Sequence, residues 1–281
     1  MIRFFFALIL SALSYAVGFA QQPKENSILW EITGNDLVVP SYLLGTFHLV
    51  CEQDLHLADK VYTAIEAVNQ IALEVDLTDS EELAIVQQFM VAKTSLSSQL
   101  TEEERAEFQR LLKEKYDIDF ASVDQLHPIF LMGMLAAKDV SCPVKGYDME
   151  ILQIGLSEKK KFIGLEHFSD QIKLINQVYT AKEILAQLYE DEVNNYEVLA
   201  TAFKREDINE LYQLAVDSRQ LTVEGKTLLV DNRNQTWVKL MAEIMPKERT
   251  LFAVGAGHLA GEQGVIALLR AKGFTVTAIL K

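Results

Sequence analysis

The stretch Leu251–Gly264, LFAVGAGHLAGEQG, decides how the fold is interpreted. Four apolar residues run into a glycine-spaced turn that carries His258. A short apolar run bounded by turn residues is typical of a strand that is buried on both faces of a sheet. Helical spacing over 265–269 and a second apolar segment over 274–280 follow. The pattern predicts a strand, turn, helix, strand unit, with His258 near the carboxyl end of the first strand, where open α/β sheets place their sites.

A second stretch near the other end of the chain has the same order. The apolar run Tyr42–Leu44 leads into Gly45-Thr46-Phe47-His48, which shares the pattern G-x-x-H with Gly255-Ala256-Gly257-His258. One such tetrapeptide carries little information. Two copies that each follow a predicted strand bring both imidazoles together if the two strands are neighbours in the sheet.

A carboxylate is predicted at the same edge of the sheet. Apolar positions at helical spacing over 57–69 predict a helix, which crosses to a strand at 71–75 and so forms a βαβ unit with parallel strands. That strand ends in Glu74-Val75-Asp76. We expect the strands that end near Glu74 and near the two G-x-x-H motifs to be neighbours, with helices covering their carboxyl edge.

The remaining patterns set the fold class. Residues Ile28–Ile32 and Leu37–Val39 suggest a hairpin around a glycine-containing turn. From about residue 78 to 245 the periodicity is helical, apart from a short predicted strand at 161–165. The sequence therefore predicts an α/β fold. Its central sheet is mixed or mostly parallel and is built from N- and C-terminal βαβ units, with a large helical insertion in the middle.

The first twenty residues have the pattern of an export signal. A lone Arg3 precedes an apolar run over 4–13, and small residues stand before Gln21. We expect cleavage after about residue 20, a single domain over 21–281, and a periplasmic or secreted location. The alternative is an uncleaved N-terminal segment that anchors the protein. No later segment is long and apolar enough to cross a bilayer.

Charge and cysteine content limit the partners and the compartment. The 281-residue chain has 26 basic and 40 acidic residues and a net charge of −14, which argues against a nucleic-acid partner. Cys51 and Cys142 are its two cysteines. In an exported protein they are expected to form a disulfide, and the alternative is two unpaired buried thiols.

Two neutral imidazoles and one carboxylate suit a catalytic metal site. Such a set leaves coordination positions for water and substrate, as hydrolytic metal sites require. The metal would lower the pKa of bound water and polarise a carbonyl. The residue types do not select among zinc, manganese, cobalt and iron. The chain has no H-E-x-x-H motif, which excludes the common zincin arrangement.

Several motifs together connect the chain to a known family. They are Gly45–His48, Glu74, Gly146-Tyr147-Asp148, Gly164-Leu165-Glu166, Arg233-Asn234, and Val254–Leu259 with Gly261 and Gly264. Through them the chain resembles the TraB/GumN family, whose members are similar to the Tiki metalloproteases, from Trp30 to Leu280. The resemblance implies a divalent-metal site at His48, Glu74 and His258 and a manganese- or cobalt-dependent protease. The family resemblance predicts the residues of the site more specifically than it predicts the substrate.

The roles of the neighbouring charged residues stay open at this stage. Glu74 is a candidate ligand or a proton shuttle, or simply a carboxylate at a strand end. Asp148, Glu166 and Arg233 are expected either to orient the ligands or to form a structural ion-pair network. The other three histidines are expected to have surface or capping roles; they are His56, His127 and His167.

The leading functional hypothesis is an exported hydrolase that depends on a divalent metal and acts on a peptide or protein substrate. Two alternatives are a metal or haem-iron binding protein without catalysis, and a periplasmic interaction protein whose site has decayed. Intact His48, Glu74 and His258 argue against decay. The sequence names neither the substrate, the metal nor the oligomeric state.

Overall fold

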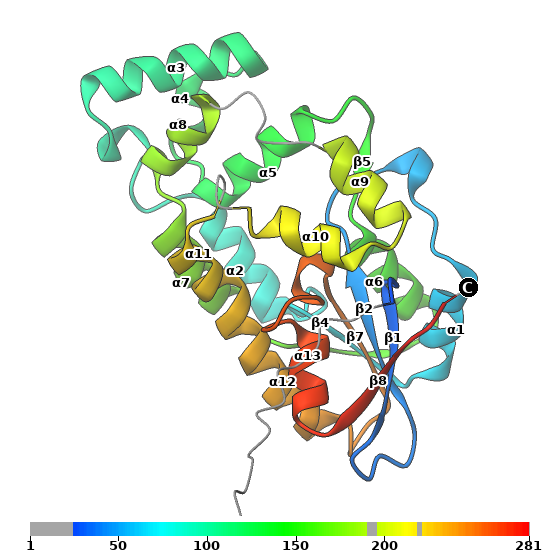
Figure 1. Cartoon of the computed structure of the whole chain (residues 1–281). Helices are drawn as coiled ribbons and strands as arrows, with labels where there is room; N and C mark the ends of the chain where they lie inside the picture. Colours follow the sequence, from blue (N-terminus) through cyan, green and yellow to red (C-terminus); the bar gives the residue numbers. More distant parts are fainter. Residues whose placement is uncertain (1–24, 190–195, 218–220, 281) are drawn as a thin grey trace, which may run out of the picture.

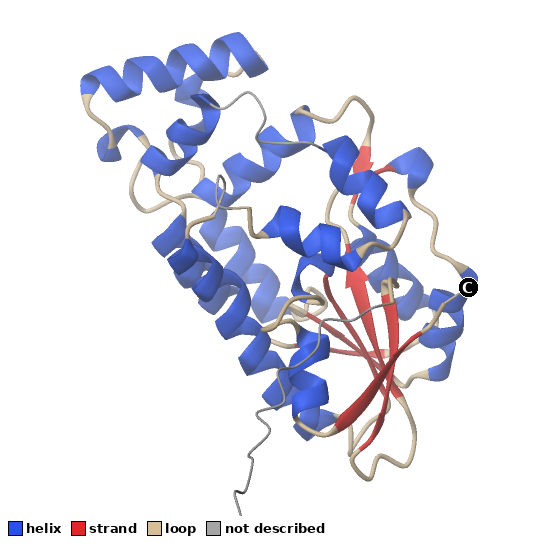
Figure 2. Ribbon diagram, viewed as in Figure 1, coloured by secondary structure: helices blue, strands red, loops and turns tan. Residues whose placement is uncertain are grey.

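The computed structural model describes residues 25–189, 196–217 and 221–280. The predicted export signal, residues 1–20, lies outside these ranges. A mixed sheet flanked by helices forms one part of the molecule, and a group of helices extends away from it (Figures 1 and 2). No helix in the described part of the chain is long and apolar enough to cross a membrane.

The central sheet has six strands in the order β6-β4-β7-β2-β1-β8. The strands are β1 (Leu29–Gly34), β2 (Ser41–Thr46), β4 (Gln70–Leu73), β6 (Lys161–Gly164), β7 (Thr250–Gly255) and β8 (Phe274–Ala278). Strands β6, β4, β7 and β2 are parallel, whereas β1 is antiparallel to both β2 and β8. The α/β prediction with a mostly parallel sheet is confirmed. The three strands before Glu74 and the two G-x-x-H motifs are consecutive neighbours.

The two strands that precede the G-x-x-H motifs form the centre of the core. Leu43 and Leu44 of β2 and Leu251 and Phe252 of β7 are completely buried. Both strands are uninterrupted apolar runs because helices cover both faces of the sheet at its centre. This burial fixes the positions from which the two histidine loops leave the sheet.

The helical crossovers leave this centre in opposite directions. Helix α1 (Asp59–Ala67) connects β2 to β4, and α13 (Val265–Ala271) connects β7 to β8 on the other side of the sheet order. Right-handed crossovers in opposite directions place their helices on opposite faces. Figure 1 shows this, with α12 (Asn232–Ile244) beside α13, and α6 (Tyr147–Ser157) on the face of α1. The gap between the carboxyl ends of β2 and β7 is therefore a topological switch point.

The long middle region supplies most of the helices. They are α2 (Ser80–Met90), α3 (Glu102–Tyr116), α4 (Phe120–Val123), α5 (Pro128–Lys138), α7 (Phe168–Val178), α8 (Ala181–Tyr189), α9 (Tyr196–Lys204), α10 (Ile208–Ala215), α11 (Val223–Lys226) and the π-helix η3 (Thr227–Asp231). Helices α3, α4, α5 and α8 enclose a hydrophobic cluster of their own around Phe108, Leu112 and Leu131. They form the group that extends away from the sheet in Figure 1.

One part of the sheet differs from the sequence prediction, and the structure adds detail to another. The expected hairpin partner of β1, Leu37–Val39, is a connection, and β1 pairs instead with β2. Pro40 has no N–H to donate, so pairing begins at Ser41. The short strand predicted inside the helical region is β6, and it pairs with β4 at the edge of the main sheet. The insertion therefore contributes to the sheet as well as to the helices.

Candidate functional site

The candidate site lies at the switch point between β2 and β7. Thr46, the last residue of β2, is paired with Gly255, the last residue of β7. His48 follows two residues after the first strand, and His258 ends the short 3-10 helix η4 (Ala256–His258) that follows the second. Glu74 comes directly after β4, the other neighbour of β7. The three predicted ligands thus leave adjacent strands at one edge of the sheet.

The three side chains meet around Gly255. Its N–H donates to Glu74 Oε1 over 2.8 Å. A Cβ at this position would lie 3.4 Å from Glu74 Oε1, 3.6 Å from His258 Cδ2 and 3.9 Å from His48 Nε2. The structure therefore brings both imidazoles and the carboxylate together, well within the separation of about 10 Å beyond which two ligands of one ion are excluded. Glycine at position 255 leaves the space between them open.

His48 is oriented by a carboxylate. Its Nδ1 lies 2.7 Å from Asp148 Oδ2, and its side chain is 69% exposed. Asp148 reaches it because the backbone N–H of Tyr147 donates to Phe47 O over 3.0 Å, which joins the start of α6 to the histidine loop. The negative charge of Asp148 raises the pKa of His48 to about 9. Since Nδ1 faces the carboxylate, Nε2 is the nitrogen directed at the junction.

His258 is oriented by an amide. Its Nδ1 lies 2.7 Å from Asn234 Oδ1. The Asn234 Nδ2 group donates to Gln263 O over 2.8 Å, so Oδ1 is the atom that accepts from the imidazole. Burial, and then the positive charge of Arg233, lower the pKa of His258 to about 3. The ring is therefore neutral near pH 7, with its Nε2 lone pair turned toward the site.

Arg233 bridges the acidic side chains of the site. Its guanidinium lies 2.6 Å from Glu74 Oε2 and 2.6 Å from Glu166 Oε1, and all three side chains are at most 14% exposed. Its NH1 group lies 3.3 Å from His258 Nε2, and its Cζ lies 4.6 Å from the centre of the Trp237 ring. Asp148, Glu166 and Arg233, the predicted supporting residues, thus all lie at the site.

The two glutamates differ in their ionisation. Burial alone would raise the pKa of Glu74, but the charge of Arg233, followed by the two histidines and the Gly255 N–H, lowers it to about 2. Burial raises the pKa of Glu166 above its ordinary value in spite of Arg233. Glu74 is consequently the fixed anion of the pair, and Glu166 is the one that accepts a proton more readily.

The two histidines of the junction are oriented in the same way. Each histidine uses Nδ1 for an oxygen partner and keeps Nε2 for the site, which is the arrangement seen in metal-bound histidines. As placed, no three His, Cys, Asp or Glu side chains in the described ranges form a group that could hold an ion. Arg233 lies between two of the candidate ligands, with NH2 donating to Glu74 Oε2 and NH1 3.3 Å from His258 Nε2. Its separate bonds to Glu166 give the guanidinium a second carboxylate partner.

A cavity of about 510 Å³ opens onto these residues. Its polar end is formed by His48, Glu74, Arg233 and His258, with Asp148 and Gln171 beside them. Most of the remaining wall is apolar and comes from α5, α6, α7 and η3. Its volume falls in the range of about 300–1,000 Å³ that is usual for small-molecule sites. The site can therefore admit part of a substrate.

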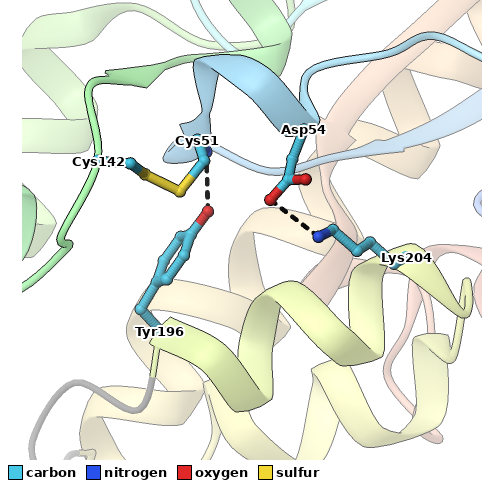
Figure 3. Close-up of a disulfide and its surroundings, with 5 residues drawn as sticks. All are labelled: Cys51, Asp54, Cys142, Tyr196 and Lys204. Carbon is cyan, nitrogen blue, oxygen red and sulfur yellow. Dashed lines mark hydrogen bonds and ion pairs between the residues drawn. A yellow bond between two sulfur atoms is a disulfide. The ribbon is translucent and has the colours of Figure 1, made fainter.

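The predicted disulfide is present and supports the His48 side of the site (Figure 3). Cys51 and Cys142 have Cα atoms 5.7 Å apart, and they lie on or beside the two-stranded sheet of β3 (Val50–Cys51) and β5 (Val144–Lys145). The Cys51 N–H donates to Tyr196 Oη over 2.8 Å. Because β3 follows His48 and β5 precedes Asp148, the disulfide ties together the two segments that carry this pair.

The other histidines lie away from the junction. His127 caps α5, His167 pairs with Glu82 over 2.6 Å, and His56 is exposed in a loop. Two further residues contact the site and were not predicted from the sequence: Gln171, which donates to Glu74 and Glu166, and Trp237, whose ring centre is 4.7 Å from that of His258.

Fold and site together define a mixed α/β protein with a two-histidine, one-glutamate junction at the switch point of its sheet. In a comparison with known families, the model of the TraB/PrgY/gumN family matches residues 28–278. The chain belongs to the TraB/PrgY/gumN family. Comparison with curated proteins and with solved structures gave no match to either.

Proposed function

We propose that this protein is a divalent-metal-dependent hydrolase of peptide bonds, in which His48, Glu74 and His258 hold the ion. The observation that carries the proposal is the matched orientation of the two histidines. Each Nδ1 is taken by a side-chain oxygen, from Asp148 or Asn234, and each Nε2 faces the junction where Glu74 stands, with Arg233 NH1 3.3 Å from that of His258. Such second partners fix the tautomer of metal-binding histidines.

The other residues of the site have separate roles in the proposed reaction. A bound divalent ion would supply a water of lowered pKa and polarise the substrate carbonyl. Arg233, held by Glu166, provides a positive charge for the oxygen on which negative charge develops. Glu166, with its raised pKa, is suited to take up and return a proton. Glu74 has either of two roles, ligand or proton shuttle.

A second candidate is a metal or haem-iron binding protein without turnover. The orientation of the histidines supports it equally, because it prepares Nε2 for an ion and does not by itself require turnover. Metal binding without peptide hydrolysis would support this alternative.

We further propose that the protein is exported to the periplasm or beyond, or anchored there by an uncleaved N-terminal segment. The Cys51–Cys142 disulfide supports an oxidising compartment. Fractionation of cells that produce the full chain, with mass determination of the N-terminus, tests cleavage near residue 20. An intact chain in the cytosolic fraction would contradict export.

The proposed function is tested by titrating the protein with manganese or cobalt in a calorimeter and by assaying a mixed peptide library with each metal. His48→Ala and His258→Ala should each weaken metal binding by more than about 100-fold, because the loss of a residue that only orients a metal ligand already costs about 10–100-fold. His56→Ala is the matched control, since this histidine is exposed and distant. A chelator should abolish turnover.

Glu74→Gln separates the two roles of the glutamate. Loss of metal affinity would identify a ligand, whereas retained metal with lost turnover would identify a proton shuttle. Unchanged metal affinity in both histidine variants would contradict the site. Peptide hydrolysis that persists in the chelator would contradict metal dependence.

A further inference from the structure

The wall of the cavity beside the histidines consists largely of apolar side chains. Six of them are only partly buried or exposed: Leu77, Ile129, Met149, Phe168, Tyr179 and Leu229. They come from the loop after β4, from α5, α6 and α7, from the residue that follows α7, and from η3. Partly open apolar groups that converge from separate elements form a surface for an apolar ligand.

This wall is continuous with the reactive end of the cavity. Met149 directly follows Asp148, the partner of His48, and it is 44% exposed. Leu229 lies one turn before Arg233, whose guanidinium donates to the Leu229 carbonyl over 3.0 Å. A group that contacts these two side chains therefore lies next to the atoms that would act on the substrate.

The electrostatics of the cavity disfavour charged side chains. An acidic side chain would lose its water against the apolar wall, and the positive groups that line the cavity, His48 and Arg233, are already paired with Asp148 and Glu74. A lysine or arginine side chain would lose water against an apolar wall, and burying a charge without a partner is costly. Asp148 and Glu74, the carboxylates that line the cavity, already have partners in His48 and Arg233.

We propose that the substrate is a peptide with a bulky apolar residue next to the bond that is cut, and that Met149 and Leu229 help to select it. This inference rests on the proposed function, because it places the apolar residue relative to the same metal site. Met149 and Leu229 act as specificity-determining residues, since they contact the side chain of the substrate and not the reacting bond.

The test compares blocked tetrapeptide amides that carry leucine, glutamate or lysine at one position in an otherwise alanine sequence. Their dissociation constants are measured by calorimetry with the metal-free full chain, and their turnover is measured with manganese. We expect the leucine peptide to bind at least about tenfold more tightly than the other two, the scale of discrimination for a hydrophobic pocket.

A pair of matched double variants tests whether Met149 and Leu229 select the apolar side chain. In the double variant Met149→Gln with Leu229→Gln, the leucine peptide should bind about as tightly as the glutamate and lysine peptides, so that the ratio of dissociation constants is close to one. The control, Leu156→Gln with Val223→Gln, changes exposed apolar residues on α6 and α11 that do not line the cavity, and it should keep the preference. Thermal melts of both double variants verify folding.

The outcomes separate the two proposals. Equal binding of the three peptides, binding of none of them, a preference for glutamate or lysine, or an unchanged preference in the Met149 and Leu229 variant would overturn the inference. Turnover without a leucine preference would overturn it and leave the hydrolase proposal standing. A leucine preference in binding without any turnover would contradict the hydrolase proposal and leave the apolar selectivity standing.

Discussion

The two G-x-x-H loops have the same motif and follow neighbouring strands, but their histidines have opposite surroundings. His48 is open to the cavity and faces the Asp148 carboxylate, whereas His258 packs between Arg233 and Trp237 and faces the neutral amide of Asn234. The pKa of His48 is raised to about 9, and that of His258 is lowered to about 3. The motif fixes the position of each imidazole, whereas the surroundings set its charge: Asp148 for His48, and burial followed by Arg233 for His258.

The loops also differ in what holds them. The His258 loop packs on the core: a Cβ on Gly257 would meet Ala215 at 2.7 Å, and Asn234 is completely buried. The His48 loop depends on the small sheet β3–β5 and on the disulfide. We therefore expect covalent and packing changes to affect the two loops unequally.

The largest effect is expected when the support of the His48 loop is removed. The disulfide closes a loop with a sequence separation of 91 residues. For a loop of that length the chain-entropy argument predicts a loss of about 4 kcal/mol in the free energy of unfolding. Cys51→Ala with Cys142→Ala, measured by urea unfolding, should show this loss, and reduction of the wild-type protein should reproduce it. A loss below about 1 kcal/mol would mean that the loop is held by packing alone.

A second comparison uses the first glycine of each motif. A Cβ on Gly45 would lie 3.0 Å from Ala256 Cβ and 3.1 Å from Leu259 Cδ2, inside the core. Gly45→Ala should therefore lower the free energy of unfolding by about 1–3 kcal/mol, the usual penalty for overpacking.

Gly255→Ala is the matched variant in the other loop. Its Cβ would make contacts of ordinary length, 3.4 Å or more, but all of them with the site residues. We expect a stability change below about 1 kcal/mol together with weaker metal binding. Thermal melts and manganese calorimetry of both variants measure the contrast. Equal loss of stability in the two variants would contradict the assignment of Gly255 to an open site.

Sequence patterns predicted the six strands of the main sheet, both histidine loops and the position of Glu74, because short apolar runs and glycine-rich turns are local signals; the additional strand predicted at Leu37–Val39 was wrong. The disulfide prediction rested on the cysteine count and the export pattern. The contacts that complete the site are not local. Gln171 reaches Glu74 across 97 residues, and Arg233 reaches it across 159. Such contacts depend on how α7 and α12 dock on the sheet, and helical periodicity does not specify that docking.

The smallest expected effect is the alkaline part of the dependence of stability on pH, which comes from His48 and is measured by unfolding of chelator-treated protein. His48 has a folded pKa of about 9, above its ordinary 6.5, so its stabilising contribution is complete below about pH 6.5 and is lost as the pH rises through about 9. Because this side chain is 69% exposed, the change should stay below about 1 kcal/mol.

The contribution of His258 to the pH dependence of stability has the opposite sign. Its folded pKa of about 3 lies below its ordinary 6.5, so stability should fall as the pH drops from about 6.5 toward 3. Asp148→Asn should remove the alkaline change and leave the acidic one. If it removed both, the two histidines would not titrate independently.

The central claim is that both histidines present Nε2 to one ion beside Glu74. Anomalous scattering from crystals of the manganese-loaded protein, recorded at a wavelength that identifies manganese, tests it most directly. We predict a single strong peak at bonding distance, about 2 Å, from Nε2 of His48 and Nε2 of His258, with Arg233 kept on Glu166. The absence of a peak between the two imidazoles, or a peak bound elsewhere with Arg233 still joined to Glu74 and His258, would contradict the account.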